Sequence, residues 1–358
     1  MEKTTRNSQF YRYKLILFNL LLMGAFVMLT PLHAASQIVL HDDPITFKPT
    51  QFYIISVNDE RNPEAVSLQG LNFEKGTAAA IYTYLTHNLS KDVALRPVVI
   101  SIKELRSTEK NQPDGRTNGI IQLHFSFGLQ KDYGIEHLVD YQGKIQYSRT
   151  AANPTIIEIN LRQLIKASLN YFNNWIEINA PINRKLASRV KIIFNNYTEK
   201  AEGDTIYYAA NRPLKWTDFQ SRIRPASRYQ ALVIPGIAYD QEVQIVKGSV
   251  IVQIAIKAFL PKSAAWADLN SRDSYTLNHE QRHFDIAKII SEEFQHKILA
   301  EKLTPDNFEG LINMQYLDTL RELNTMQNAY DNETSHGLNR SAQSAWNERI
   351  DVRLKENL

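Results

Sequence analysis

The chain has 358 residues, a length that predicts two domains, and its 43% hydrophobic and 22% charged residues are typical of a folded globular protein. It contains no cysteine, which excludes disulfide bonds, thiol nucleophiles, cysteine-ligated metals and a lipid-modified N-terminal cysteine. A metal site in this chain would therefore need histidine, aspartate and glutamate ligands.

The formal net charge of +3 belongs to the N-terminal segment. Residues 1–36 carry four basic side chains and one acidic one, so the rest of the chain has 37 of each sign and gives no support for a nucleic-acid partner. The basic residues precede an apolar run over 15–30, and small residues follow at 34–36. This pattern predicts a signal peptide over 1–36, or a signal anchor that tethers the chain to a membrane through residues 15–30. We expect the remainder to be exported, either periplasmic or secreted.

Residues 37–200 mix strand and helix patterns and predict an α+β domain. The predicted strands cover 52–57, 96–102, 119–129 and 139–148, and the predicted helices cover 76–89 and 154–178. Charge, proline and glycine over 109–117 predict a surface loop. No nucleophile–base pair, phosphate-binding loop or metal-ligand spacing occurs in this part, so its role is unknown and we expect a binding or tethering module.

A polar stretch over 195–204 predicts a domain boundary, which we place between residues 200 and 201. A strand over 205–210 follows, and then a hairpin of 242–246 and 249–260 that turns at Lys247-Gly248. The last part of the chain predicts three helices, over 275–302, 305–327 and 341–355. Strands followed by helices indicate an α+β fold, with a small antiparallel sheet and three helices in residues 201–358.

The first of these helices opens with a pattern that suits a zinc site, His279-Glu280-Gln281-Arg282-His283. Histidines four residues apart lie about 40° apart around a helix, so both imidazoles can reach one Zn²⁺. Glu280 is placed to address a water beside the metal rather than the metal itself, which is the position of a general base.

A zinc site of this kind needs a third protein ligand. Asp285 lies about 200° around the helix from His283 and points away. The connection at 303–304 is short, so the next helix should run antiparallel and end level with the two histidines, at about 1.5 Å per residue. The segment just beyond that end offers three candidates, in order of preference His336, Glu333 and Asp331.

Three segments in this half, followed by Gln343 and Trp346-Asn347, resemble a family of bacterial proteins described as predicted secreted zinc-dependent proteases, a domain otherwise of unknown function. These segments are RPLKWTDF over 212–219, LNHEQRHFDIA over 277–287 and YDNETSHG over 330–337. The resemblance covers about the C-terminal 155 residues. It implies a zincin-like metallopeptidase fold, zinc at His279 and His283, and His336 as third ligand. The chain departs from the family at 263–266, where Trp266 does not directly follow Ser263.

Together these patterns predict an exported zinc peptidase that acts on polypeptide substrates. Glu280 would transfer protons, and Tyr330 would donate a hydrogen bond to the oxyanion. An extended substrate could pair with the edge of the sheet formed by 242–260. Two alternatives stay open: a zinc-dependent hydrolase of another envelope amide, for example in the cell wall, and a non-catalytic envelope-binding protein with a vestigial zinc site.

Overall fold

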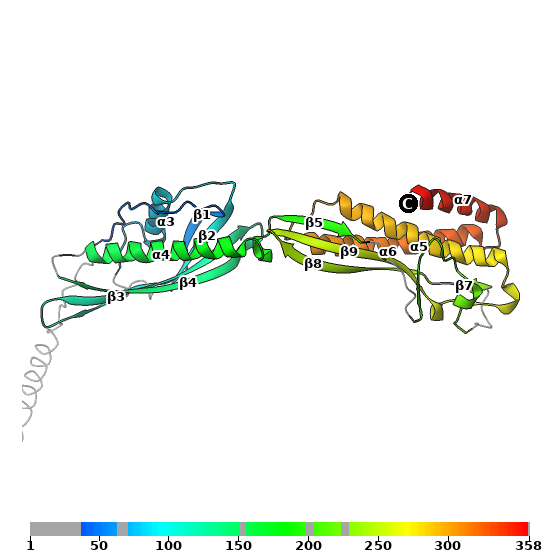
Figure 1. Cartoon of the computed structure of the whole chain (residues 1–358), viewed down its shortest axis with the longest axis horizontal. Coiled ribbons are helices and arrows are strands. Elements are labelled where there is room, and N and C mark those ends of the chain that lie inside the picture. The colour runs from blue at the N-terminus through cyan, green and yellow to red at the C-terminus, as the bar shows by residue number, and fades with distance from the viewer. Residues whose placement is uncertain are drawn as a thin grey trace, which may run out of the picture. The chain divides into compact units, whose positions relative to one another are not determined.

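The computed structural model describes residues 37–62, 71–150, 153, 155–195, 197, 203–222 and 229–356. The predicted signal peptide lies outside the described residues. Contacts divide the chain into two compact units, Met1–Phe172 and Asn173–Leu358. Each unit combines a β-sheet with helices, so the predicted α+β class is confirmed (Figure 1).

The first unit is a four-stranded sheet in the order β1-β2-β3-β4. Its elements are β1 (Phe52–Asp59), α3 (Thr77–Asn88), β2 (Arg96–Asn111), β3 (Thr117–Lys131), β4 (Gly134–Arg149) and the first part of α4 (Thr155–Asn179). β1 pairs with β2 in parallel, across the α3 connection, while β2, β3 and β4 are antiparallel. The core joins the sheet to α4, where the rings of Phe127 and Phe172 stack with centroids 4.2 Å apart. The helices therefore cover one face of this sheet.

The strands of the first unit are longer than the apolar pattern predicts. β2 and β3 form a hairpin that continues to the pair Asn111↔Thr117, so the loop predicted over 109–117 is wrong for its outer residues. The end of this hairpin is solvated on both faces, and its side chains therefore give no apolar alternation.

The second unit contains a mixed sheet and three helices. Its elements are the end of α4, β5 (Arg189–Phe194), β6 (Thr205–Tyr207), β7 (Ala231–Leu232), β8 (Gly236–Val246), β9 (Ser249–Pro261), β10 (Trp266–Ala267), α5 (Ser274–Ala300), α6 (Phe308–Thr334) and α7 (Arg340–Glu356). Short 3₁₀ turns lie at Arg184–Leu186, Trp216–Asp218, Lys262–Ala264 and Leu269–Ser271.

β9 is the centre of that sheet, since β5, β6 and β8 all pair with it. The predicted β8–β9 hairpin is present and turns at Lys247 and Gly248, both with positive φ. β5 pairs with β9 in parallel, so the sheet is mixed rather than purely antiparallel. The polar stretch over 195–204 therefore lies between two strands of one unit, and the domain boundary predicted at 200/201 stays a prediction.

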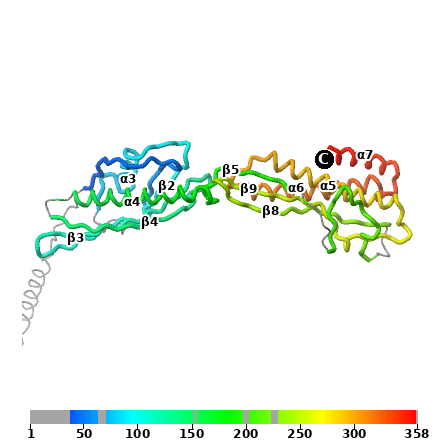
Figure 2. The backbone as a smooth tube through the Cα atoms, in the orientation of Figure 1, coloured from blue at the N-terminus to red at the C-terminus, as the bar shows by residue number. Residues whose placement is uncertain are grey.

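Helices α5 and α6 pack side by side against one face of the mixed sheet (Figure 2). Val252 and Ile254 of β9 are fully buried against Phe294 of α5 and Phe308 of α6. A second core cluster, which includes Phe284 of α5 and Trp346 of α7, packs around the N-terminal half of α5, whereas Phe294 belongs to the C-terminal half. In this way the N-terminal half of α5, with the histidine motif, is enclosed by α6, α7 and the β7 segment. Among the described helices, none is both long and apolar enough to cross a membrane.

Candidate metal centre

The start of α5 sets the orientation of the histidine motif. Asp273 caps the helix, because its side chain accepts a hydrogen bond from the Thr276 backbone N–H at 2.7 Å. His279 and His283, one turn apart, follow on a buried side of the helix with ring centroids 5.0 Å apart. Both imidazoles therefore point into the same enclosed space, as the sequence predicts.

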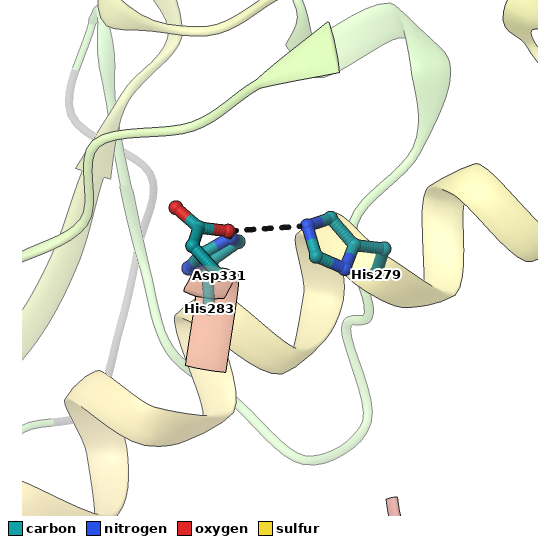
Figure 3. A group of neighbouring side chains, drawn as sticks. All are labelled: His279, His283 and Asp331. Atoms are coloured by element: carbon teal, nitrogen blue, oxygen red, sulfur yellow. Dashed lines mark ion pairs between the residues drawn. The ribbon is translucent and has the colours of Figure 1, made fainter. Parts of the chain in front are cut away.

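Asp331 of α6 completes the group. Its Oδ1 lies 3.0 Å from His283 Nε2 and 3.4 Å from His279 Nε2 (Figure 3). Within the described residues, these three side chains form the group of potential metal ligands whose ligand atoms, two imidazole nitrogens and one carboxylate oxygen, all lie within 4.8 Å of one another. The packing of α6 against α5 thus places a carboxylate beside the two imidazoles, as counting residues along two antiparallel helices predicts.

The far edge of each imidazole is held by a glutamine. His283 Nδ1 contacts Gln327 Oε1, and Gln327 Nε2 donates to the backbone oxygen of His283 at 2.8 Å. His279 Nδ1 lies 2.9 Å from Gln343 Oε1 on α7. An N–H at Nδ1 bonded to an amide oxygen leaves the lone pair at Nε2, on the side of Asp331, available for a cation. Both rings are therefore held with Nε2 toward Asp331, in the orientation of metal ligands.

Glu280 lies beside this group and is 97% buried, with a relative exposure of 3%. The backbone N–H of Val233 donates to its carboxylate, while Oε2 is buried without a hydrogen-bond partner. Burial raises the pKa of Glu280 above its ordinary range, although the two histidines oppose this effect. A carboxylate with one oxygen fixed and the other unpaired can accept a proton from a bound water.

The electrostatics of the group suit a cation. Burial works to raise the pKa of Asp331, but the adjacent imidazoles of His279 and His283 outweigh it and hold that pKa far below its ordinary value. Asp331 Oδ1 is buried without a hydrogen-bond partner, as is Glu280 Oε2. The buried Glu280 and the half-buried Asp331 each have a carboxylate oxygen without a hydrogen-bond partner beside two imidazoles. This arrangement fits a divalent ion, and the donor set is one that Zn²⁺ commonly takes.

His336 and Glu333 lie outside the group of mutually close ligand atoms, and the choice of His336 as third ligand stays a prediction. His336 Nδ1 lies 3.4 Å from Asp331 Oδ1, and its side chain is 38% exposed at the rim. Glu333 is turned elsewhere, since its Oε2 accepts a hydrogen bond from the indole N–H of Trp346 at 2.8 Å. Asp331, the third candidate in the sequence ranking, is the residue that meets both histidines.

α6 is longer than predicted, and this difference accounts for the altered order of candidates. The helix continues to Thr334 rather than ending near residue 327, so Asp331 is helical and faces α5. The stop is a turn in which Ser335, His336 and Gly337 all have positive φ. Non-glycine residues rarely adopt this conformation, so two in succession indicate local strain beside the group.

Tyr330 is fully buried and packs on His279, with ring centroids 4.8 Å apart. Its hydroxyl lies 2.9 Å from His279 Nδ1 and accepts a hydrogen bond from Gln343 Nε2 at 2.6 Å. These contacts are on the edge of the ring opposite Nε2. The geometry therefore makes Tyr330 a positioning residue for His279 and gives no support to its predicted role as oxyanion donor.

A cavity of about 210 Å³ opens onto the group. One wall is the β7 segment, with Gln230, Ala231 and Leu232, and His336 and Tyr275 line other sides. Among the described strands, β7 pairs with β10 alone, along one of its two edges. The strands of the 242–260 hairpin contribute no lining residue, so the substrate-pairing edge expected there stays a prediction, and β7 is the strand that lines the cavity.

The outward residues of the motif fasten α5 to its neighbours. Gln281 Oε1 accepts from the backbone N–H of Leu214 at 2.7 Å, and Gln281 Nε2 donates to Asp285 at 2.8 Å. Arg282 donates to Asp285 and, on α7, to Asp351. Asp285 thus points away from the cavity, as its helical angle predicts. These contacts connect two of the segments that carry the family resemblance, 212–219 and the motif helix, to each other and to α7.

Residues 247–337 match a family described as "Bacterial protein of unknown function (DUF922)". The match covers about a quarter of the chain and includes all of α5 and α6 and all three members of the histidine–aspartate group. The C-terminal region thus contains a bacterial domain of unknown function with a buried group that could hold a metal ion.

Two further comparisons add little. No curated protein matches the chain. The crystal structure of a minor lipoprotein from Acinetobacter baumannii aligns with 34% of this chain and 92% of its own length, at 16% identity and a TM-score of 0.19. That score is too low to relate the two folds.

Proposed function

We propose that the second unit is a zinc-dependent peptidase and that His279, His283 and Asp331 hold the metal. The observation that carries this proposal is the convergence of two imidazole Nε2 atoms on one carboxylate oxygen of Asp331 beside a buried glutamate. Zinc in such a site supplies an activated water and polarises a carbonyl group.

The roles of the surrounding residues follow from their positions. Glu280 accepts the proton of the attacking water at Oε2 and passes it to the leaving nitrogen. His336 lines the cavity beside Tyr229, with ring centroids 4.5 Å apart, and donates an N–H to the carbonyl oxygen as negative charge develops there. An extended polypeptide enters along β7, whose backbone offers hydrogen bonds that do not depend on side-chain identity.

Neutral amides behind the histidines support a catalytic rather than a structural metal. Carboxylates in this position make imidazole a stronger donor, whereas the carboxamides of Gln327 and Gln343 do so less. With one anionic ligand and two neutral ones, the metal keeps a net positive charge and hence its ability to polarise water. A buried base beside the group has no purpose in a structural site.

We also propose that the protein acts outside the cytoplasm, because residues 1–36 have the pattern of a secretory leader. The leader, if it is retained, tethers the protein through residues 15–30. The electrically balanced remainder supports a polypeptide rather than a nucleic acid as partner.

Metal content and hydrolysis of an unfolded protein test this proposal on the purified exported chain. We expect about one zinc in the second unit, lost in His283→Ala and Asp331→Asn. Glu280→Gln should keep its zinc and lose 10²–10⁴-fold in rate. Glu333→Gln is the matched control and should keep both properties. Zinc retained in Asp331→Asn but lost in His336→Asn would return the third ligand to the residue preferred from sequence.

Substrate identity is tested in parallel. Hydrolysis of cell-wall amides without cleavage of peptides would assign the other amide substrate. Equal rates for Glu280→Gln and the unaltered chain would contradict catalysis and favour an envelope-binding protein.

A further inference from the structure

The first unit presents a polar sheet face opposite its helices. On β3, Leu123, Phe125 and Phe127 are buried on the helix side, and the residues between them belong to the other face. There His124 pairs with Glu104 of β2 and Gln142 of β4. This open face therefore carries an imidazole flanked in register by a carboxylate and an amide.

A β-bulge adds a second imidazole to this face. Residues three apart on a regular strand point to opposite faces, so His137 and Asp140 would be separated by the sheet. The register of β3 and β4 shifts between Phe127 and Gly128, which leaves Leu138 as the extra residue. As a result, His137 and Asp140 lie on the same face as His124. Bulges commonly redirect side chains at functional sites.

The three side chains meet at the Asp140 carboxylate. His137 Nε2 lies 3.0 Å from Oδ1, and His124 Nε2 lies 3.7 Å from Oδ2. His124 Nε2 is buried from solvent and has no hydrogen-bond partner. A hollow of about 260 Å³ adjoins His124 and is also lined by Glu104 and Lys144. An enclosed imidazole nitrogen that has no hydrogen-bond partner and faces a carboxylate is available to coordinate a metal ion.

We infer that His124, His137 and Asp140 bind a divalent transition-metal ion in the first unit. Two imidazoles and one carboxylate form a borderline donor set that favours Zn²⁺, Ni²⁺ or Cu²⁺ over Mg²⁺ or Ca²⁺. Ser126, whose hydroxyl bonds to Asp140, orients the carboxylate. Glu104 is paired with Arg106 at 3.3 Å and is left out of the ligand set.

This second site is less preorganised than the one in the second unit. Its two imidazoles approach different oxygens of the carboxylate, whereas His279 and His283 converge on one oxygen. Metal binding must therefore draw the 58% exposed His137 side chain toward His124. We expect weaker binding there, and a bound ion would clamp β3 to β4 across the bulge.

Calorimetric titration of the full chain with ZnCl₂ tests the inference. The unaltered chain should bind about two equivalents, and the His279→Ala/His283→Ala chain should keep the weaker one. Adding His137→Asn to that chain should lower the remaining affinity at least tenfold. The matched control is His87→Asn, which removes an exposed imidazole 3.4 Å from Asp42 and should change nothing.

The outcomes separate this site from the proposed peptidase site. No zinc binding by the His279→Ala/His283→Ala chain, with its circular dichroism unchanged, would overturn the inference. If that double variant does not fold, His137→Asn in the otherwise unaltered chain gives the answer. It should lose the second equivalent and keep the first, and retention of both equivalents would overturn the inference.

Discussion

Gln327→Ala probes the idea that the metal ligands are held from behind. Gln327 makes two contacts with one residue, accepting from the His283 ring at Nδ1 and donating to the His283 backbone oxygen at 2.8 Å. Alanine removes both contacts without touching the cavity, since Gln327 is not one of its lining residues. Any change in zinc affinity must therefore act through His283.

The expected magnitude follows from those two bonds. A buried N–H left without a partner costs about 1–3 kcal/mol, and part of that cost appears only when the ring must present Nε2 to the metal. This corresponds to a loss of about 10–100-fold in zinc affinity, the range typical of residues that orient a metal-bound imidazole. The rate of the zinc-loaded variant should fall less than its affinity.

Competition with a chromogenic chelator measures the affinity, and circular dichroism checks that α5 and α6 remain folded. Gln315→Ala is the matched control, because Gln315 lies on the same helix and bonds to Glu301 at 2.7 Å instead. A zinc affinity of Gln327→Ala within twofold of the control would refute the reasoning and show that the His283 ring is oriented without this amide.

Three further results are expected. Gly337→Ala should lower the free energy of unfolding by about 1–2 kcal/mol, because alanine is strained at a φ of +82°. It should also weaken zinc binding, because the new Cβ would lie 3.3 Å from His279 Cγ. The control Gly115→Ala, at a φ of +80° with nothing within 4 Å, should show only the loss of stability. Chelation should lower the free energy of unfolding, by about 4 kcal/mol when free zinc had been a thousandfold above its Kd. Arg149 lowers the pKa of Glu109 from its ordinary 4.5, so this pair stabilises the first unit above about that pH and is lost as pH falls through the depressed value. Urea unfolding of Glu109→Gln should therefore show about 1 kcal/mol lost at neutral pH and a shrinking difference in acid, whereas a constant difference would contradict the assignment.

The sequence predicts the motif helix well because two independent constraints coincide there. Histidine spacing and the apolar face of the helix both place His279 and His283 on one side of α5. The third ligand is harder, because it depends on where α6 ends. Asn332, Glu333 and Thr334 are part of a polar run that predicts a loop.

Tertiary packing overrides that local preference. Tyr330 and Thr334 are fully buried, and they continue the spacing of buried residues set by Leu323. That spacing is the signal by which the longer helix could have been found. The glutamines behind the histidines give no such signal, because an isolated Gln327 or Gln343 on a helix is ordinarily solvated.

The contribution of α7 shows how far the site extends beyond its cavity. No residue of α7 lines the cavity among the described residues, yet Gln343 fixes His279, and Trp346 packs on Tyr330 with centroids 5.4 Å apart. Arg282 ties the same helix to the motif through Asp351. Docking of α7 is thus coupled to the orientation of a metal ligand on α5. By linkage, a bound metal must stabilise α7 against local unfolding by as much as α7 improves metal affinity.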